Sequence, residues 1–175
     1  MPSAPEIALE PVGHQHEAAI QRLASDPEVA ATTPLPHPYP VDGAASFVAD
    51  AAQARAQGTA YHYAILEGGE CVGLCALKEI DPTRRSGEAG YWLGRPYWGR
   101  GVATAAMRLL LGIAQLDLGL RLVTAHTLEH NHRSVRVLEK LGFEPVRREP
   151  NANRLKVSRA DSFLVFYELR LARRE

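Results

Sequence analysis

The residues with the clearest chemical use in this sequence form a glycine-rich turn, Gly99-Arg100-Gly101, between a predicted strand and a predicted helix. Glycine lets the backbone turn tightly and lets a ligand approach the main chain. The helix predicted from Val102 would direct its free N–H groups and the positive end of its dipole at this turn, where Arg100 adds a full charge. The pattern therefore predicts an anion site, with phosphate as the expected ligand.

Two common nucleotide-binding motifs do not fit this turn. A nucleoside triphosphate P-loop needs Gly-Lys followed by Ser or Thr, and no such triplet follows Gly99. The dinucleotide fingerprint needs a third glycine, and Thr104 stands there instead. Because Gly-x-Gly between a strand and a helix also occurs as a plain tight turn, the rest of the chain has to decide whether this turn binds a ligand.

Three further side chains have types and positions suited to chemistry. Glu88 lies on the predicted strand that leads into the turn, on the same face as Gly90 and Trp92. Asn131 is the expected N-cap of a later helix, and Ser134 follows in its first turn. Each also has an ordinary interpretation, Glu88 as an exposed strand carboxylate and the other two as capping residues.

Three histidines, His126, His130 and His132, fall within seven residues and raise the question of a metal site. His126 is expected on a strand, whereas Asn131 starts a helix between the other two. The three imidazoles are therefore not expected to converge on one ion, and we predict no metal.

Length and composition favour one soluble domain spanning residues 1–175. The chain is 46% hydrophobic, and its 20 Lys and Arg balance its 20 Asp and Glu, so no basic excess points to nucleic acid or a membrane surface. The N-terminus lacks the basic and apolar regions of a signal peptide, and no apolar run is long enough to span a bilayer. A cytoplasmic location is the expectation.

The two cysteines, Cys71 and Cys75, are predicted to be buried thiols. On an extended strand they would lie on the same face about 13 Å apart, too far for a disulfide or a shared metal. Basic residues crowd a late segment, which we interpret as a solvated face, with a site for an acidic partner as the alternative: Arg147, Arg148, Arg154, Lys156 and Arg159.

Hydrophobic periodicity and helix breakers predict the elements that must position these residues. We expect helices over residues 14–25, 42–57, 102–119 and 132–141, with Pro27 closing the first and Asp42 capping the second. Expected strands cover residues 6–10, 61–66, 71–80, 88–93, 121–127, 143–146 and 162–169. This order predicts an α+β fold, in which an antiparallel meander precedes one strand-helix-strand unit.

Four prolines between residues 33 and 40 predict a stiff, extended loop. Such loops often border binding sites. His37 and Tyr39 either contact a substrate there or belong to an ordinary surface linker.

Three segments together resemble the GNAT superfamily of acyl-CoA-dependent N-acetyltransferases: EAGYWL at 88–93, YWGRGVAT at 97–104 and NHRSVRVLEKLGF at 131–143. The Rim-like branch, which contains the ribosomal-protein alanine N-terminal acetyltransferases, is the most similar, and the resemblance covers roughly residues 8–171. It implies a twisted, mostly antiparallel sheet that is splayed at its centre and flanked by about four helices. Coenzyme A would enter between the strands at 88–93 and 121–127.

The resemblance implies acetyl-CoA as co-substrate, with its pyrophosphate on the glycine turn and its pantetheine arm along the preceding strand. Arg136 is a further candidate for a phosphate contact or a solvated side chain, and Pro96 replaces the Gln or Arg that the family commonly has there. The residues implied to bind acetyl-CoA are Trp92, Leu93, Gly94, Trp98, Gly99, Arg100, Gly101, Val102, Ala103, Thr104, Asn131 and Arg133.

The catalytic residues implied by the resemblance are Glu88, Ser134 and Asn131. Glu88 would accept the amine proton directly or through water, and a strand N–H near Leu93 would hold the thioester carbonyl. Many relatives use a Tyr at the position of Leu138 to protonate the departing thiolate, whereas Rim-like proteins assign that role to a serine matching Ser134. Because a thiolate is a modest leaving group, loss of the acid should slow the reaction without abolishing it.

The predicted function is acetyl-CoA-dependent N-acetylation of a primary amine, with a protein or peptide N-terminus as the leading acceptor. Two alternatives remain: acetylation of a small amine such as an antibiotic or polyamine, and a non-catalytic acyl-CoA-binding module, which Leu138 keeps open. The acceptor pocket is expected to involve residues 34–39, 42–57 and 147–161. The sequence does not identify the acceptor, and it leaves a homodimer open.

Overall fold

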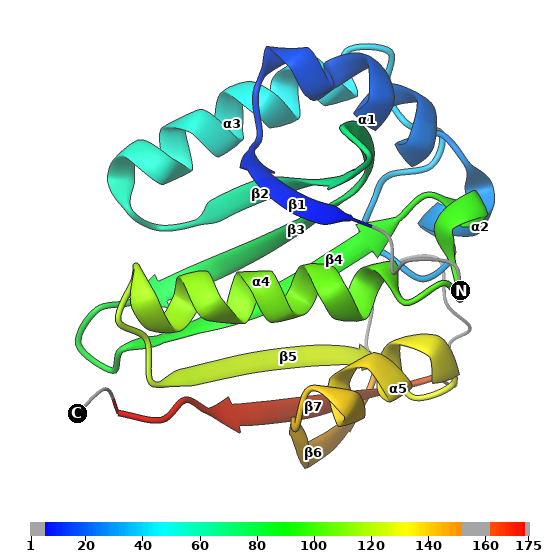
Figure 1. The fold of residues 1–175 in the computed structure, drawn as a ribbon. Coiled ribbons are helices and arrows are strands. Elements are labelled where there is room, and N and C mark those ends of the chain that lie inside the picture. The colour runs from blue at the N-terminus through cyan, green and yellow to red at the C-terminus, as the bar shows by residue number, and fades with distance from the viewer. Residues whose placement is uncertain (1–5, 152–161, 174–175) are drawn as a thin grey trace.

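A seven-stranded sheet runs through the protein in the order β1-β2-β3-β4-β5-β7-β6 (Figure 1). The computed structural model describes residues 6–151 and 162–173. The predictions for the N-terminal five residues and for Arg154, Lys156 and Arg159 lie outside the described residues. The strands are β1 Ile7–Pro11, β2 Tyr61–Glu67, β3 Glu70–Asp81, β4 Ser86–Leu93, β5 Leu122–Leu128, β6 Glu144–Pro150 and β7 Phe163–Arg170.

Within the described residues, the four predicted helices are present, together with a short fifth α-helix. Pro27 was expected to close the first helix, but it begins the extra helix, because the missing proline N–H is not needed in a first helical turn. The Asp26 side chain caps this helix by accepting from the Glu28 N–H at 2.9 Å. The helices are α1 Glu17–Ala24, α2 Pro27–Ala30, α3 Gly43–Gln57, α4 Val102–Leu116 and α5 His132–Lys140.

The start of α3 differs from the prediction in its capping. Asp42 occupies the N-cap position, but its side chain makes no capping hydrogen bond. Gln21 of α1 takes over part of this role, because its side-chain oxygen accepts from the Ala44 N–H at 3.1 Å. At the other end, the helix ends at residue 57, the predicted boundary, where Gly58 adopts the left-handed conformation with φ 70°.

The sheet opens between β4 and β5. These strands pair in parallel only from Ser86↔Leu122 to Glu88↔Thr124, and both continue beyond that point. The other neighbouring strands in the described residues pair antiparallel. The α+β prediction of a mostly antiparallel sheet splayed at its centre is therefore confirmed.

The two faces of the sheet are covered by different helices (Figure 1). Side chains of β4 such as Leu93 pack in the main core with α4, whereas Trp92 packs with Leu74 in a second cluster beneath α1 and α3. Because strand side chains alternate, one strand, β4, contributes to both clusters. Any cavity that passes through the opening next to β4 therefore has one wall from each of the two clusters.

Cys71 and Cys75 are buried as predicted, but they lie on opposite faces of β3. The pairing of β2 with β3 shifts there, because Ile65 pairs with Gly73 while Leu66 pairs with Cys71. This β-bulge inserts one extra residue and reverses the alternation of side chains. The prediction of a shared face is therefore wrong.

Candidate functional site

The glycine turn after β4 has an open shape suited to a bound anion. Gly99 and Gly101 adopt left-handed conformations with φ 70° and 80°, and a Cβ at either position would meet no atom within 4 Å. Gly101 is the N-cap of α4 and provides no side-chain cap. The first N–H groups of α4 therefore face the turn without a helical partner, as phosphate binding at a helix N-terminus requires.

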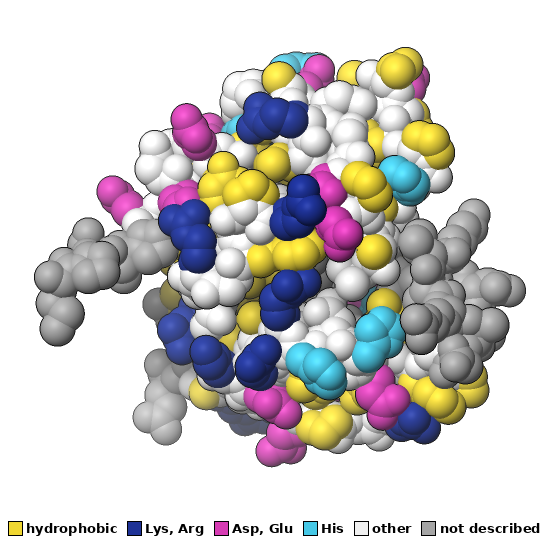
Figure 2. Space-filling view, turned by 90° about the vertical axis from the view of Figure 1, so that its right-hand side faces the viewer, with side chains coloured by type: hydrophobic (Ala, Val, Ile, Leu, Met, Phe, Trp, Pro, Cys, Tyr) yellow, Lys and Arg dark blue, Asp and Glu magenta, His cyan; other side chains and the backbone are white. Residues whose placement is uncertain are grey.

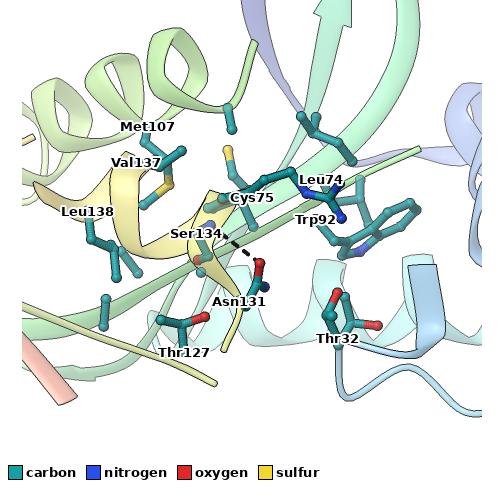
Figure 3. Close-up of a pocket in the computed structure, with 18 of the residues that line it drawn as sticks. Thr32, Leu74, Cys75, Trp92, Met107, Thr127, Asn131, Ser134, Val137 and Leu138 are labelled. Atoms are coloured by element: carbon teal, nitrogen blue, oxygen red, sulfur yellow. Dashed lines mark hydrogen bonds between the residues drawn. The ribbon is translucent and has the colours of Figure 1, made fainter. Parts of the chain in front are cut away.

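A cavity of about 600 Å³ lies against this turn and passes through the opening between β4 and β5. In Figure 3, Met107, Val137 and Leu138 stand on one side of it and Leu74 and Trp92 on the other, with other lining side chains between them. The cavity thus has an α4–α5 half and an α3 half. The two halves meet at the opening in the sheet.

Most residues implied by the family resemblance meet at this cavity. Gly94 and Arg100 are outside its lining, and Arg100 is instead paired with Glu67 through a contact of 2.9 Å. The other predicted cofactor-binding and catalytic residues line it: Glu88, Trp92, Leu93, Trp98, Gly99, Gly101, Val102, Ala103, Thr104, Asn131, Arg133 and Ser134. Arg136 also lines it.

Main-chain groups of β4 face the opening at alternate residues. The Gly94 N–H donates to the Val72 carbonyl of β3 at 2.9 Å, which directs the main chains of Gly94 and Trp92 toward β3. The main-chain N–H and C=O groups of Tyr91 and Leu93 therefore point the other way, toward the opening. The Trp98 indole N–H donates to the Leu93 carbonyl at 2.9 Å, so that carbonyl is already occupied and the Leu93 N–H is the main-chain group of this residue that suits a ligand.

Glu88 is the last residue of β4 that pairs with β5, and it lies where the cavity begins. One carboxylate oxygen is 3.5 Å from His126 Nδ1 and the other is 3.7 Å from Lys78 Nζ. The interaction with His126 holds the pKa of Glu88 below its usual range, although burial alone would raise it. Glu88 is therefore ionised at neutral pH.

Sequence reasoning missed the role of His126 in this site. It treated the residue only as a candidate metal ligand, whereas His126 lies on β5, two residues beyond the last β4–β5 pair, and lines the cavity. Its Nδ1 atom is buried and has no closer partner than Glu88 in the described part of the chain. The signal available in the sequence was its place on the second strand of the predicted opening.

The start of α5 brings polar groups to the cavity. The Asn131 side chain accepts from the Ser134 N–H at 3.4 Å, as expected of an N-cap (Figure 3). Burial raises the pKa of the Tyr91 phenol, and a hydrogen bond with the Ser134 side chain partly opposes this. Arg133 stacks over the Trp98 ring at 4.0 Å, which joins α5 to the glycine turn.

The α3 half of the cavity is mainly apolar and contains a neutral histidine. Phe47 and His62 meet edge to face with ring centroids 5.1 Å apart. Burial lowers the pKa of His62 to about 4, and Lys78 and Arg55 add to the effect, so the ring is uncharged at neutral pH.

The predicted acceptor segments contribute unequally to this half. Residues 32–35 and Phe47 line the cavity, but His37, Tyr39 and the described residues of the 147–161 segment do not. Residues 152–161, which complete that segment, lie outside the described residues.

Positive charge dominates the cavity and its surroundings. Apart from histidine, its charged lining in the described chain consists of one acid, Glu88, and four bases, Lys78, Arg133, Arg136 and Lys140. Figure 2 shows Lys and Arg side chains spread over the end of the molecule where α4 begins. This surplus suits a ligand with several phosphates.

Residues 6–151 and 162–173 contain neither a group of candidate metal ligands nor a membrane-spanning helix. No three His, Cys, Asp or Glu side chains come together as a metal-binding group. No helix is long and apolar enough to cross a membrane.

The chain belongs to the acetyltransferase (GNAT) domain family, whose profile matches residues 6–144. This confirms the family predicted from the three motifs. Among curated relatives, the uncharacterized N-acetyltransferase p20 of Bacillus licheniformis is 32% identical over 50% of this chain and 51% of its own length. The chain thus aligns with about half the length of this relative.

Solved structures confirm the fold. RimJ of Mycobacterium smegmatis, in complex with CoA-disulfide, has a TM-score of 0.86 at 23% identity, over 95% of this chain and 83% of that one. RimL, a ribosomal L7/L12 α-N-protein acetyltransferase in complex with coenzyme A, has a TM-score of 0.84 at 18% identity, over 94% of each chain. Spermidine N-acetyltransferase of Vibrio cholerae, in complex with CoA and spermine, has a TM-score of 0.81 at 15% identity, over 94% of this chain and 95% of that one.

Proposed function

We propose that this protein is an acetyl-CoA-dependent N-acetyltransferase whose acceptor is the α-amine of a protein or peptide. The observation that carries the proposal is the position of Glu88, which lies where the two halves of the cavity meet. A donor held by the glycine turn and an amine entering from the α3 half would both reach this carboxylate. Acetyl-CoA would supply the activated acetyl group as a thioester.

The α4–α5 half has the groups needed to hold acetyl-CoA. The N–H groups at the start of α4 and the open turn at Gly99 and Gly101 suit the pyrophosphate, and Arg133 adds charge beside them. The Leu93 N–H suits the thioester carbonyl, because a donor aimed at that oxygen stabilises the negative charge that develops during acyl transfer. The cavity volume of about 600 Å³ also fits a cofactor-sized ligand.

The electrostatics of Glu88 favour an α-amine as acceptor. A carboxylate with a lowered pKa is a weak base, so it works best on an amine that already loses its proton near neutral pH. An α-amine has a pKa of about 8, whereas a lysine-type amine has a pKa of about 10.4. Glu88 would accept the proton through water as the N–C bond forms.

The departing thiolate would receive its proton from Ser134, and water would return a proton to Ser134 and remove the one that Glu88 took from the amine. Ser134 lies at the start of α5 on the cavity wall, and Leu138, the position of the usual tyrosine acid, is buried without a hydroxyl. The hydrogen bond between Tyr91 and Ser134 would orient the serine hydroxyl. The products are an amide and free coenzyme A.

The names of the structural neighbours support amine acetylation, but they include both a protein N-terminal and a polyamine acceptor. The test is to mix the protein with acetyl-CoA and a panel of peptides and small amines while following free thiol. Turnover that needs a free peptide α-amine supports the proposal. Tight acetyl-CoA binding without turnover on any acceptor would favour a non-catalytic binding module instead.

A further inference from the structure

The α3 half of the cavity has a floor made of three successive cross-strand pairs between β3 and β4. Leu74 pairs with Trp92, Ala76 with Gly90, and Lys78 with Glu88. All six residues line the cavity. Successive pairs on one face lie about 7 Å apart. The small Ala76–Gly90 pair therefore lies between an apolar pair on one side and the charged Lys78–Glu88 pair on the other.

Gly90 leaves space in this floor, and the backbone conformation at this position does not require a glycine. Its φ lies outside the left-handed region, so other residues could adopt the same conformation. A Cβ at this position would meet no atom within 4 Å, and glycine is poorly suited to the interior of a strand. The glycine is therefore explained by the vacant volume above it, next to the Glu88 carboxylate.

The surroundings of this volume define what it can hold. Leu74, Trp92 and Phe47 provide apolar and aromatic surface on one side, and His62 is neutral. Glu88 is the one acid that lines the cavity in the described chain, and it already contacts Lys78. A second ammonium group on the acceptor would thus find no further carboxylate among the described residues that line the cavity.

We propose that Gly90 determines acceptor specificity, because the space above it receives the apolar group attached to the amine-bearing carbon. The acceptor class is accordingly a monoamine with a bulky apolar substituent, such as a peptide that begins with Leu or Phe, and not a polyamine. This inference rests on the proposed acetyltransferase function. It adds to that function the size and charge of the group that the acceptor carries beside its reacting nitrogen.

The test compares Gly90→Ala and Gly90→Val with the wild type on peptides that differ only in a first residue of Gly, Ala, Leu or Phe. Each added methyl group should fill the vacant space, so the ratio of kcat/KM for Leu-first to Gly-first peptide should fall at least 10-fold in Gly90→Val. Acetyl-CoA affinity, which depends on the α4–α5 half of the cavity, should stay within about threefold. Gly112→Ala is the matched control, because Gly112 also has open space around its Cβ position but lies on α4 outside the cavity.

The outcomes separate this inference from the proposed function. A Leu-to-Gly ratio that is unchanged in Gly90→Val would overturn the inference while leaving the proposed function intact. Spermidine used by the wild type better than any peptide would overturn both the inference and the α-amine acceptor of the proposed function, while leaving acetyl transfer intact. A wild-type protein that acetylates no amine would instead overturn the proposed function. Melting temperatures of the variants within a few degrees of wild type would show that the change in ratio is not a folding defect.

Discussion

His126 Nδ1 of β5 lies 3.5 Å from Glu88 Oε2 of β4, across the point where the two strands stop pairing. Lys78 approaches the other oxygen of the same carboxylate at 3.7 Å. These two contacts keep Glu88 ionised and fix its position between the two halves of the cavity. The opening in the sheet is therefore both the route through the cavity and the place where the Glu88 carboxylate is held by charged and polar neighbours.

Removing the imidazole should change the pH dependence of the reaction. The interaction with His126 lowers the pKa of Glu88, so His126→Gln should raise that pKa. The acidic limb of kcat/KM for peptide should then move to higher pH, with activity near pH 6 reduced more than activity near pH 8. An acidic limb that stays in place would show that His126 does not act through Glu88.

Two substitutions at the start of α5 should separate catalysis from capping. Ser134→Ala should lower kcat about 10-fold with little change in thermal stability, because the Asn131 cap accepts from a main-chain N–H that alanine retains. Asn131→Ala should remove the cap and cost about 1 kcal/mol of unfolding free energy. Parallel kinetics and denaturant unfolding of both variants check this, and equal kcat for Ser134→Ala and wild type would remove Ser134 from the mechanism.

The two arginines implied in phosphate binding should differ in importance. Arg100 is neutralised by Glu67 and lies outside the cavity lining, whereas Arg133 lines the cavity and stacks on Trp98. Arg133→Gln should raise the Kd for coenzyme A about 5- to 10-fold, and Arg100→Gln should raise it less than twofold. Isothermal titration at two salt concentrations measures both, and a larger effect at Arg100 would show that it leaves Glu67 to bind phosphate.

The features that the sequence could predict are those that local patterns determine. The glycine turn, the capped start of α5 and the periodicity of α4 each depend on residues close together in the chain, and each is present. The bulge at Val72 and the contact of His126 with Glu88 depend on strand register over long separations, which no local pattern specifies. For the same reason, the vacancy above Gly90 was not predicted.

Stability should depend on pH through His62. Its pKa is about 4 in the folded protein and about 6.5 when unfolded, so the unfolded chain binds more protons between these values. The stability that His62 contributes is complete above pH 6.5 and falls as the pH drops toward 4. Because the ring is partly exposed, we expect a loss on the order of 1–2 kcal/mol. The melting temperature of His62→Gln should therefore decline less than that of wild type between pH 7 and pH 4.5, and identical declines would contradict this.

The most direct test of the central claim is to incubate the protein with acetyl-CoA and a peptide that has one free α-amine and one lysine. Mass spectrometry then locates any acetyl group added to the peptide. We expect acetyl-CoA to modify the α-amine, and Glu88→Gln to lower the rate about 100-fold without changing acetyl-CoA affinity. Glu144→Gln, at an exposed carboxylate outside the cavity, is the matched control and should retain wild-type rate. Acetylation of the lysine alone, or an undiminished rate in Glu88→Gln, would contradict the account.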